Sequence, residues 1–180
     1  MRPRHVHITG ASGAGVTTLG RALAKRLGAV HVDTDDAYWL PVEPAYSAKR
    51  PVPERLAMIE ACLEREDRVV LSGSIMTWGD PLIPWFGAVV FVSTEPAIRM
   101  ERLRRREFER YGDAILPGGP RHDACAAFLE WASRYEDPAF ASRSRARHEA
   151  WLGTLSCPVI RVDGGGPPGQ VVDATLAALG

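Results

Sequence analysis

The chain has 180 residues, the length of one domain of ordinary size, and its 22 basic residues balance 22 acidic ones. A formal net charge of zero gives no support to a protein that coats nucleic acid through bulk charge. Three widely separated cysteines without a CxxC pair argue against a disulfide framework and a zinc site. No apolar run approaches the roughly 18 residues of a membrane span, so we expect a cytoplasmic protein that does not insert into membranes.

The first part of the chain alternates strands and helices. Residues 5–9 predict a short buried strand that leads into a glycine-rich turn. Residues 17–27 have apolar side chains at helical spacing and stop near Gly28, a natural helix C-cap. A second strand at 29–32 runs directly into the acidic sequence DTDD at 33–36.

The middle of the chain continues this alternation. Residues 39–53 are rich in proline and aromatic residues and predict a loop, and residues 54–66 predict a helix. Strands are expected at 68–71 and 88–92, and the next helix, at 96–110, is strongly charged.

The last part of the chain begins with a loop at 111–121, predicted from its glycines and prolines. Helices are expected at 122–136 and 140–153, and a fifth strand at 158–162. A closing helix is expected at 171–179.

Strands that alternate with helices predict an α/β fold, in which a mostly parallel sheet is covered by helices on both faces. We expect one domain over residues 1–180. Ligands in such sheets bind at the carboxyl ends of the strands. The glycine-rich turn, the acidic sequence and the charged helix all follow strands, so we expect them to meet at one edge of the sheet.

Residues 9–18 read TGASGAGVTT and join the first strand to the first helix. Glycines let backbone N–H groups converge on an anion, and the helix dipole adds to that attraction. Gly10, Gly15 and Thr17 match the P-loop pattern GxxxxGK[ST], but Val16 stands where the pattern has lysine. The predicted nucleotide-binding residues of this loop are Gly10, Ala11, Ser12, Gly13, Ala14, Gly15, Val16, Thr17 and Thr18.

Two other interpretations of the glycines remain open. The dinucleotide fingerprint GxGxxG fits less well, because glycines at 10, 13 and 15 give GxxGxG. The chain is also short for a dinucleotide domain with a substrate site, although the acidic residues about 20 positions on would suit a ribose. The third interpretation is a glycine turn with a purely structural role.

The sequence GASGAG-x-TT, the DTDD sequence and a basic helix before a glycine-containing loop together resemble the P-loop kinases of small molecules. Adenylate and other nucleoside-monophosphate kinases, and the shikimate and gluconate kinases, are the similar groups, and the likeness spans nearly the whole chain. The resemblance implies a three-layer P-loop NTPase fold with five parallel strands in the order 2-3-1-4-5 and a mobile lid at about 111–121. It also implies that ATP, or another nucleoside triphosphate, and Mg²⁺ bind here.

The acidic sequence then acquires expected roles. In the shikimate and gluconate kinases that this chain resembles, the first aspartate of a DxD pair faces the magnesium and the second acts on the acceptor hydroxyl. Carried over by position, Asp33 and the Thr17 hydroxyl are the metal-side groups, and Asp35 is the catalytic base. The alternative is that Asp33 or Thr34 caps a short helix.

The missing lysine normally reaches the β- and γ-phosphates, which Val16 cannot do. Arg102 and Arg106 are spaced i, i+4 before the predicted lid, and Arg143 and Arg147 repeat that spacing after it. The resemblance implies that arginines on either side of the lid close over the transferring phosphate, so we assign Arg102, Arg106 and Arg143 to catalysis. The alternative is that these arginines pair with glutamates on solvated helix faces.

The loops after the second and third strands combine aromatic and cationic residues, which suits a flat or sugar-like acceptor with an anionic group. The resemblance also places Asp163, after the fifth strand, beside the nucleotide base. The predicted acceptor-binding residues are Lys49, Arg50, Arg55, Gly73 and Trp78.

We therefore expect an ATP-dependent phosphotransferase that acts on a small hydroxyl- or phosphate-bearing acceptor, as a monomer or homodimer. A non-catalytic nucleotide-binding or sensing protein with a degenerate P-loop is the first alternative. A dinucleotide-binding, oxidoreductase-like protein is the second.

Overall fold

The sheet of the computed structural model, which describes residues 3–180, has five strands, and every neighbouring pair is parallel. The strand order is β2-β3-β1-β4-β5, which confirms the predicted fold. β3 lies between β1 and β2, whereas a dinucleotide domain places its first two strands side by side. The strands are β1 (His5–Gly10), β2 (Val30–Asp33), β3 (Val69–Ser72), β4 (Ala88–Ser93) and β5 (Val159–Asp163).

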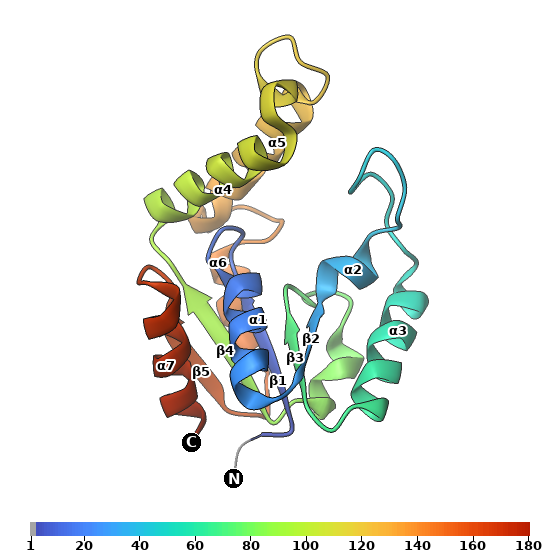
Figure 1. The fold of residues 1–180 in the computed structure, drawn as a ribbon, viewed down its shortest axis with the longest axis vertical. Coiled ribbons are helices and arrows are strands. Elements are labelled where there is room, and N and C mark those ends of the chain that lie inside the picture. The colour runs from blue at the N-terminus through green and yellow to red at the C-terminus, as the bar shows by residue number, and fades with distance from the viewer. Residues whose placement is uncertain (1–2) are drawn as a thin grey trace.

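Helices cover both faces of the sheet, as Figure 1 shows. Helices α1 (Val16–Leu27) and α7 (Pro168–Leu179) pack on one face, and α3 (Val52–Arg65) and α6 (Arg145–Leu152) pack on the other. Because successive side chains of a strand point to opposite faces, both faces of the central strands need apolar partners. The central strands β1, β3 and β4 are accordingly buried along almost their whole length.

Helices α4 (Pro96–Tyr111) and α5 (His122–Ser133) stand beyond the carboxyl edge of the sheet and form a lobe of their own (Figure 1). Met100, Leu103 and Ala132 hold the two helices together in a small separate apolar cluster. The short elements are α2 (Thr34–Tyr38) and the 3₁₀ turns η1 (Asp80–Trp85), η2 (Gly112–Ile115) and η3 (Arg134–Glu136).

The segment after α5 differs most from its prediction. We expected a helix over 140–153, but α6 begins only at Arg145. Ser144 is the N-cap, and its hydroxyl accepts a hydrogen bond from the backbone N–H of Arg147, which fixes the helix start. Arg143 therefore lies outside the helix, and Arg143 and Arg147 do not share a helix face as their spacing predicted. The 111–121 loop also differs, since it contains η2, and its role as a lid stays a prediction.

Three histidines, His5, His7 and His148, are buried without a carboxylate beside them, and burial lowers the pKa of each. The shifts of His7 and His148 are the large ones. His7 lies on β1, donates a hydrogen bond from Nδ1 to the carbonyl oxygen of Leu71 (3.2 Å), and has its pKa lowered to about 4 by burial. The ring nitrogens of His148 lie 2.8 Å from the Tyr135 hydroxyl and 3.3 Å from the Thr9 hydroxyl. Burial and the nearby Arg143 lower the pKa of His148 to about 3. Both rings are therefore neutral in the folded protein at neutral pH.

We expect the free energy of unfolding to fall as the pH drops below about 6.5, the ordinary histidine value, because only the unfolded chain then protonates these two rings. The stability is complete above that pH and decreases down to the folded-state pKa values of about 4 and 3. Between pH 7 and pH 5 the loss is on the order of a few kcal/mol. Urea unfolding at pH 7 and pH 5 measures it.

The substitution His148→Gln should reduce this pH dependence, whatever it does to absolute stability. His122→Gln is the control, because His122 is on the surface and should leave the dependence as in the wild type. If the free energy of unfolding depends on pH equally in His148→Gln and the wild type, His148 is not one of the groups responsible.

Candidate nucleotide- and acceptor-binding site

The glycine-rich turn, residues 10–15, connects β1 to the N-terminus of α1 at the carboxyl edge of the sheet. Gly13 has a φ of 79° and Gly15 a φ of 97°, the left-handed region that other residues rarely adopt. Such turns arrange successive N–H groups into a concave anion site, and the N-terminus of a helix adds a partial positive charge. The turn therefore has the backbone geometry of a phosphate-binding loop.

Packing also requires glycine at two of these positions. A Cβ on Gly10 would lie 2.5 Å from the carbonyl oxygen of Val92, and one on Gly13 would lie 2.6 Å from that of Arg99. Both contacts are shorter than van der Waals distance and involve backbone atoms, so they could not be relieved by a side-chain rotation. The glycines thus let β4 and α4 approach the loop closely.

Side chains from other elements hold the carbonyl oxygens of the turn. Arg99 Nη1 donates to Ser12 O (3.1 Å), and Thr94 Oγ1 donates to Ala14 O (3.0 Å). The C=O and N–H of a planar trans peptide point in opposite directions. These two hydrogen bonds therefore turn the N–H groups of Gly13 and Gly15 away from Arg99 and Thr94.

The Val16 side chain does not reach into this site as a lysine would. It is the first residue of α1 and packs against the apolar cluster between α1, α7 and the sheet. The first turn of the helix consequently offers backbone N–H groups and the Thr17 and Thr18 hydroxyls, but no charged side chain.

Thr17 and Asp33 meet although they are 16 residues apart. Thr17 Oγ1 donates a hydrogen bond to Asp33 Oδ2 (3.0 Å), and Asp33 Oδ1 accepts one from the backbone N–H of Asp35 (3.1 Å). Asp33 is thus the N-cap of α2, as the alternative interpretation held, and also lies beside the predicted metal-side threonine. One carboxylate makes both contacts because β2 ends, and α1 begins, at the same edge of the sheet.

These two side chains fit a magnesium ion. Mg²⁺ prefers oxygen ligands and is usually held by one or two protein groups together with substrate phosphates and water. Thr17 and Asp33 supply a hydroxyl and a carboxylate next to the turn. Within residues 3–180 there is no group of three or more His, Cys, Asp or Glu side chains that could hold a metal by itself.

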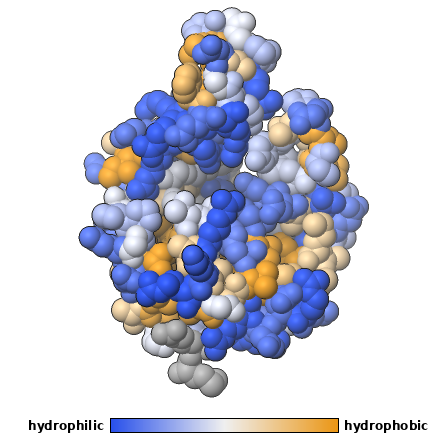
Figure 2. All heavy atoms as spheres, in the orientation of Figure 1, coloured by the Kyte–Doolittle hydropathy of each residue, from blue (hydrophilic) through white to orange (hydrophobic). Residues whose placement is uncertain are grey.

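Asp35 has an environment suited to a proton acceptor. Its carboxylate is reached by solvent but is surrounded by protein atoms, and this desolvation, followed by the charge of Asp33, raises its pKa. The positive charges of Arg143 and Arg106 act in the opposite direction. Figure 2 shows the surface hollowed between the hydrophilic α4 lobe and the part of the molecule that carries α2.

The three arginines assigned to catalysis lie in different places. Arg143 Nη2 donates to Gly10 O and to Ser12 Oγ, both at 3.2 Å. Arg102 Nη1 donates to Gly164 O (2.9 Å), beside the turn. Arg106 instead pairs with Glu107 at 2.8 Å, as the ion-pair alternative held, although the Glu107 carboxylate is buried rather than solvated.

Sequence reasoning missed Arg99, which is fully buried and supports Ser12. Its guanidinium lies over the Tyr135 ring at 4.9 Å, and its Nη2 is 3.6 Å from the Glu136 carboxylate. Arg99, Arg102 and Arg106 form one stripe at helical spacing, a signal that could have found Arg99.

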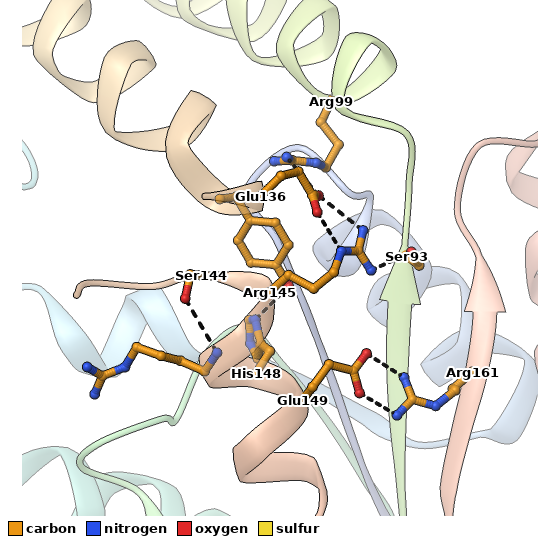
Figure 3. Close-up of polar contacts among 10 residues, drawn as sticks. Ser93, Arg99, Glu136, Ser144, Arg145, His148, Glu149 and Arg161 are labelled. Carbon is orange, nitrogen blue, oxygen red and sulfur yellow. Dashed lines mark hydrogen bonds and ion pairs between the residues drawn. The ribbon is translucent and has the colours of Figure 1, made fainter. Parts of the chain in front are cut away.

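Glu136 is shared between two arginines, as Figure 3 shows. Arg145 pairs with it at 2.6 Å and also donates to Ser93 Oγ (3.3 Å) on β4. The carboxylate thereby ties α4, the start of α6 and the sheet together, and its negative charge is already compensated.

The predicted acceptor residues lie around Tyr38. Arg55 is buried, with its guanidinium 3.9 Å from the centre of the Tyr38 ring and 5.5 Å from that of Trp78. Lys49 lies 5.8 Å from the Tyr38 ring, and Arg50 donates to Ala37 O (3.0 Å). The structure therefore brings these cations and aromatic rings together.

The remaining predicted residues have clear structural surroundings. A side chain on Gly73, where φ is 123°, would collide with Thr34. Trp78 is nine-tenths buried and packs in the core with α3, so little of its surface is available to a ligand. Asp163 accepts a hydrogen bond from Gly165 N (2.8 Å), which shapes the loop after β5, and its place beside the nucleotide base stays a prediction.

A separate concavity of 530 Å³ lies at the amino ends of the strands and is lined mainly by apolar residues such as Ala88, Ile160 and Leu179. It is at the opposite edge of the sheet from the glycine-rich turn. Its two charged residues, Arg4 and Arg68, donate to backbone carbonyls, so the cavity offers no reactive group.

Residues 6–118 match the model of a family described as an AAA domain. The chain belongs to this AAA domain family. A relative in the same size range, the uncharacterized protein YqaC of Bacillus subtilis (strain 168), is 44% identical over 176 residues, which are 98% of this chain and 97% of the relative.

Solved structures similar to this AAA domain protein include small-molecule kinases. A gluconokinase from Sinorhizobium meliloti 1021 is 20% identical, with 97% of this chain and 90% of that chain covered and a TM-score of 0.56. A shikimate kinase from Acinetobacter baumannii in complex with shikimate is 17% identical, with 97% and 92% covered and a TM-score of 0.56. The fold is therefore that of the P-loop small-molecule kinases, as predicted. None of the helices in residues 3–180 combines the length and apolarity that crossing a bilayer requires.

We expect Gly13→Ala to reduce nucleotide affinity roughly 10-fold or more, because the new Cβ would be strained at this φ and would displace the Arg99 carbonyl. Calorimetric titration with Mg·ATP measures the affinity, and thermal unfolding separates it from loss of the fold. Gly169→Ala is the control, since no atom lies within 4 Å of its added Cβ. Wild-type affinity in Gly13→Ala would show that nucleotide does not use this turn.

Proposed function

We propose that this protein transfers the γ-phosphoryl group of ATP, or of another nucleoside triphosphate, to a small hydroxyl- or phosphate-bearing acceptor. The observation that carries the proposal is the hydrogen bond between Thr17 at the glycine-rich turn and Asp33 at the end of β2. This contact between the start of α1 and the end of β2, with Asp35 two residues away, supports a donor side at the turn and an acceptor side at α2.

The donor would bind with its phosphates on the turn and the N-terminus of α1. The N–H groups of Gly13 and Gly15 face away from the carbonyl-holding side chains, and they would donate to phosphate oxygens. Thr17 and Asp33 would hold Mg²⁺, which neutralises charge on the phosphates when bound.

Asp35 would act as the base. The acceptor oxygen forms a bond to the γ-phosphorus, the bond from that phosphorus to the bridging oxygen breaks, and the diphosphate leaves. The proton of the acceptor hydroxyl passes to Asp35, and its raised pKa makes this carboxylate a better acceptor than an ordinary aspartate. Positioning and charge, rather than covalent chemistry by the protein, would provide the rate.

The acceptor would lie among Tyr38, Lys49, Arg50 and Arg55. Arg55 stacks on Tyr38, donates from Nε to the carbonyl oxygen of Arg50 (2.6 Å) and forms no ion pair among the described residues. Its charge, although the side chain is buried, would favour an anionic group on the acceptor. Aromatic rings beside cations suit a flat or sugar-like molecule. We infer a small acidic or phosphorylated acceptor.

A non-catalytic nucleotide-binding role is the second candidate, and Val16 favours it. An apolar side chain packed on the core replaces the lysine that assists transfer in other P-loops. Mg·ATP binding is common to both candidates, whereas single-turnover transfer to a panel of nucleosides, nucleotides and sugar acids occurs only in the first.

We expect equilibrium titration to detect binding of Mg·ATP or Mg·GTP, with weaker binding when EDTA removes the metal. The backbone groups of the turn hold phosphate, and Thr17 and Asp33 add the metal contribution. No binding at millimolar nucleotide would end both candidate functions.

We expect Asp33→Asn to lower transfer roughly 100-fold or more, with only a modest loss of nucleotide affinity. The amide can still cap α2 but lacks the charge beside Thr17. Asp36→Asn, an exposed carboxylate on the same short helix, is the matched control. The single-turnover transfer rates of the two variants are compared. Equal rates would contradict the assignment of Asp33 as a magnesium ligand.

A further inference from the structure

The first turn of α1 has no cation, yet the site has a partly buried one, Arg143, that reaches the turn from elsewhere. We propose that Arg143 supplies to the triphosphate the positive charge that the lysine at position 16 supplies in an ordinary P-loop. This inference rests on the proposed function and names the group that compensates for Val16.

Arg143 contacts the turn directly but only through uncharged acceptors. Its Nη2 donates to the carbonyl oxygen of Gly10 and to the hydroxyl oxygen of Ser12. Its Nε is buried and has no hydrogen-bond partner. The Nη2 end of the guanidinium is therefore held at the turn, while the Nε–H has no acceptor.

No carboxylate in residues 3–180 forms an ion pair with Arg143. The acidic residues nearest to it in sequence, Asp137 and Glu149, pair with Arg134 and Arg161. Glu136 is already paired with Arg145 and Arg99 (Figure 3). Even a partly buried charge is costly to keep without a counter-ion. An anion that arrives at the turn would supply the missing counter-charge.

The position of Arg143 also spans the two halves of the site. It touches Ser12 on the donor side, and its charge acts on Asp35 on the acceptor side. The transferred phosphoryl group passes between these two sides. A cation with both neighbours lies where negative charge must be compensated during transfer.

The other two candidate arginines are less available. Arg106 is paired with Glu107. Arg102 donates to Gly164 O and, at 3.5 Å, to Ala14 O, and it is not among the charges that act on Asp35. Arg102 therefore serves the loop after β5, whereas Arg143 serves the path of the phosphoryl group.

The experiment compares Mg·ATP and AMP binding in Arg143→Gln and in a matched control. Glutamine keeps a donor for Gly10 but removes the charge. Arg147→Gln is the control, because Arg147 lies four residues away, is exposed, and its guanidinium donates to Ala141 O rather than to the turn. We expect Arg143→Gln to lose roughly 10- to 100-fold in Mg·ATP affinity and little in AMP affinity. Arg143→Lys should keep most of the Mg·ATP affinity.

The substitution Val16→Lys completes the test. In the Arg143→Gln background it should restore most of the lost Mg·ATP affinity, while in the wild type it should add little. Equal Mg·ATP affinity of the Arg143→Gln and Arg147→Gln variants would overturn the proposal, as would parallel losses for ATP and AMP or the absence of rescue by lysine. Failure of the wild type itself to bind Mg·ATP would instead overturn the proposed function.

Discussion

The hydrogen bonds to the carbonyl oxygens of the glycine-rich turn are the constraint on which the site depends. Glycine can adopt many backbone conformations, so a turn with two left-handed glycines could take several shapes. No side chain within the turn selects one of these shapes. Arg99 and Thr94 hold Ser12 and Ala14 from α4 and the loop after β4, and so set the direction of the intervening N–H groups. The geometry of the turn is thus set by elements that lie 80 or more residues away in the sequence.

Burying Arg99 for this purpose requires compensation. Its guanidinium stacks on Tyr135 and approaches Glu136, which also pairs with Arg145. Tyr135 in turn contacts the neutral His148, whose other nitrogen faces Thr9 on β1. The turn, the α4–α5 lobe and α6 are therefore connected through one buried polar network. Each buried polar group in this network needs its hydrogen-bond partner. A substitution anywhere in the network should therefore alter the position of the turn.

The sequence predicted the fold because its signals are local. Apolar runs of strand length, helical spacing and the glycine turn give the element order, and family resemblance supplied the sheet order that the structure confirms. The meeting of Thr17 with Asp33 also followed, because both come at the carboxyl ends of strands. Arg99 was missed because burial of a charged residue depends on tertiary partners, Tyr135 and Glu136, that spacing alone does not reveal. The Arg143–Arg147 pair was misjudged because the Ser144 cap starts α6 two residues after Arg143.

Because Val16 has no charge, the positive charge proposed to act on the phosphates comes from Arg143, which lies on a different part of the chain. A lysine at position 16 would be carried by α1, the helix that begins at the turn itself. Arg143 instead belongs to the segment between η3 and α6, which follows the α4–α5 lobe in the chain. The position of that segment is set by Ser144, Arg145 and Glu136. Compensation of phosphate charge would then depend on the packing of this lobe against the turn, so the valine couples the two parts more closely than a lysine would.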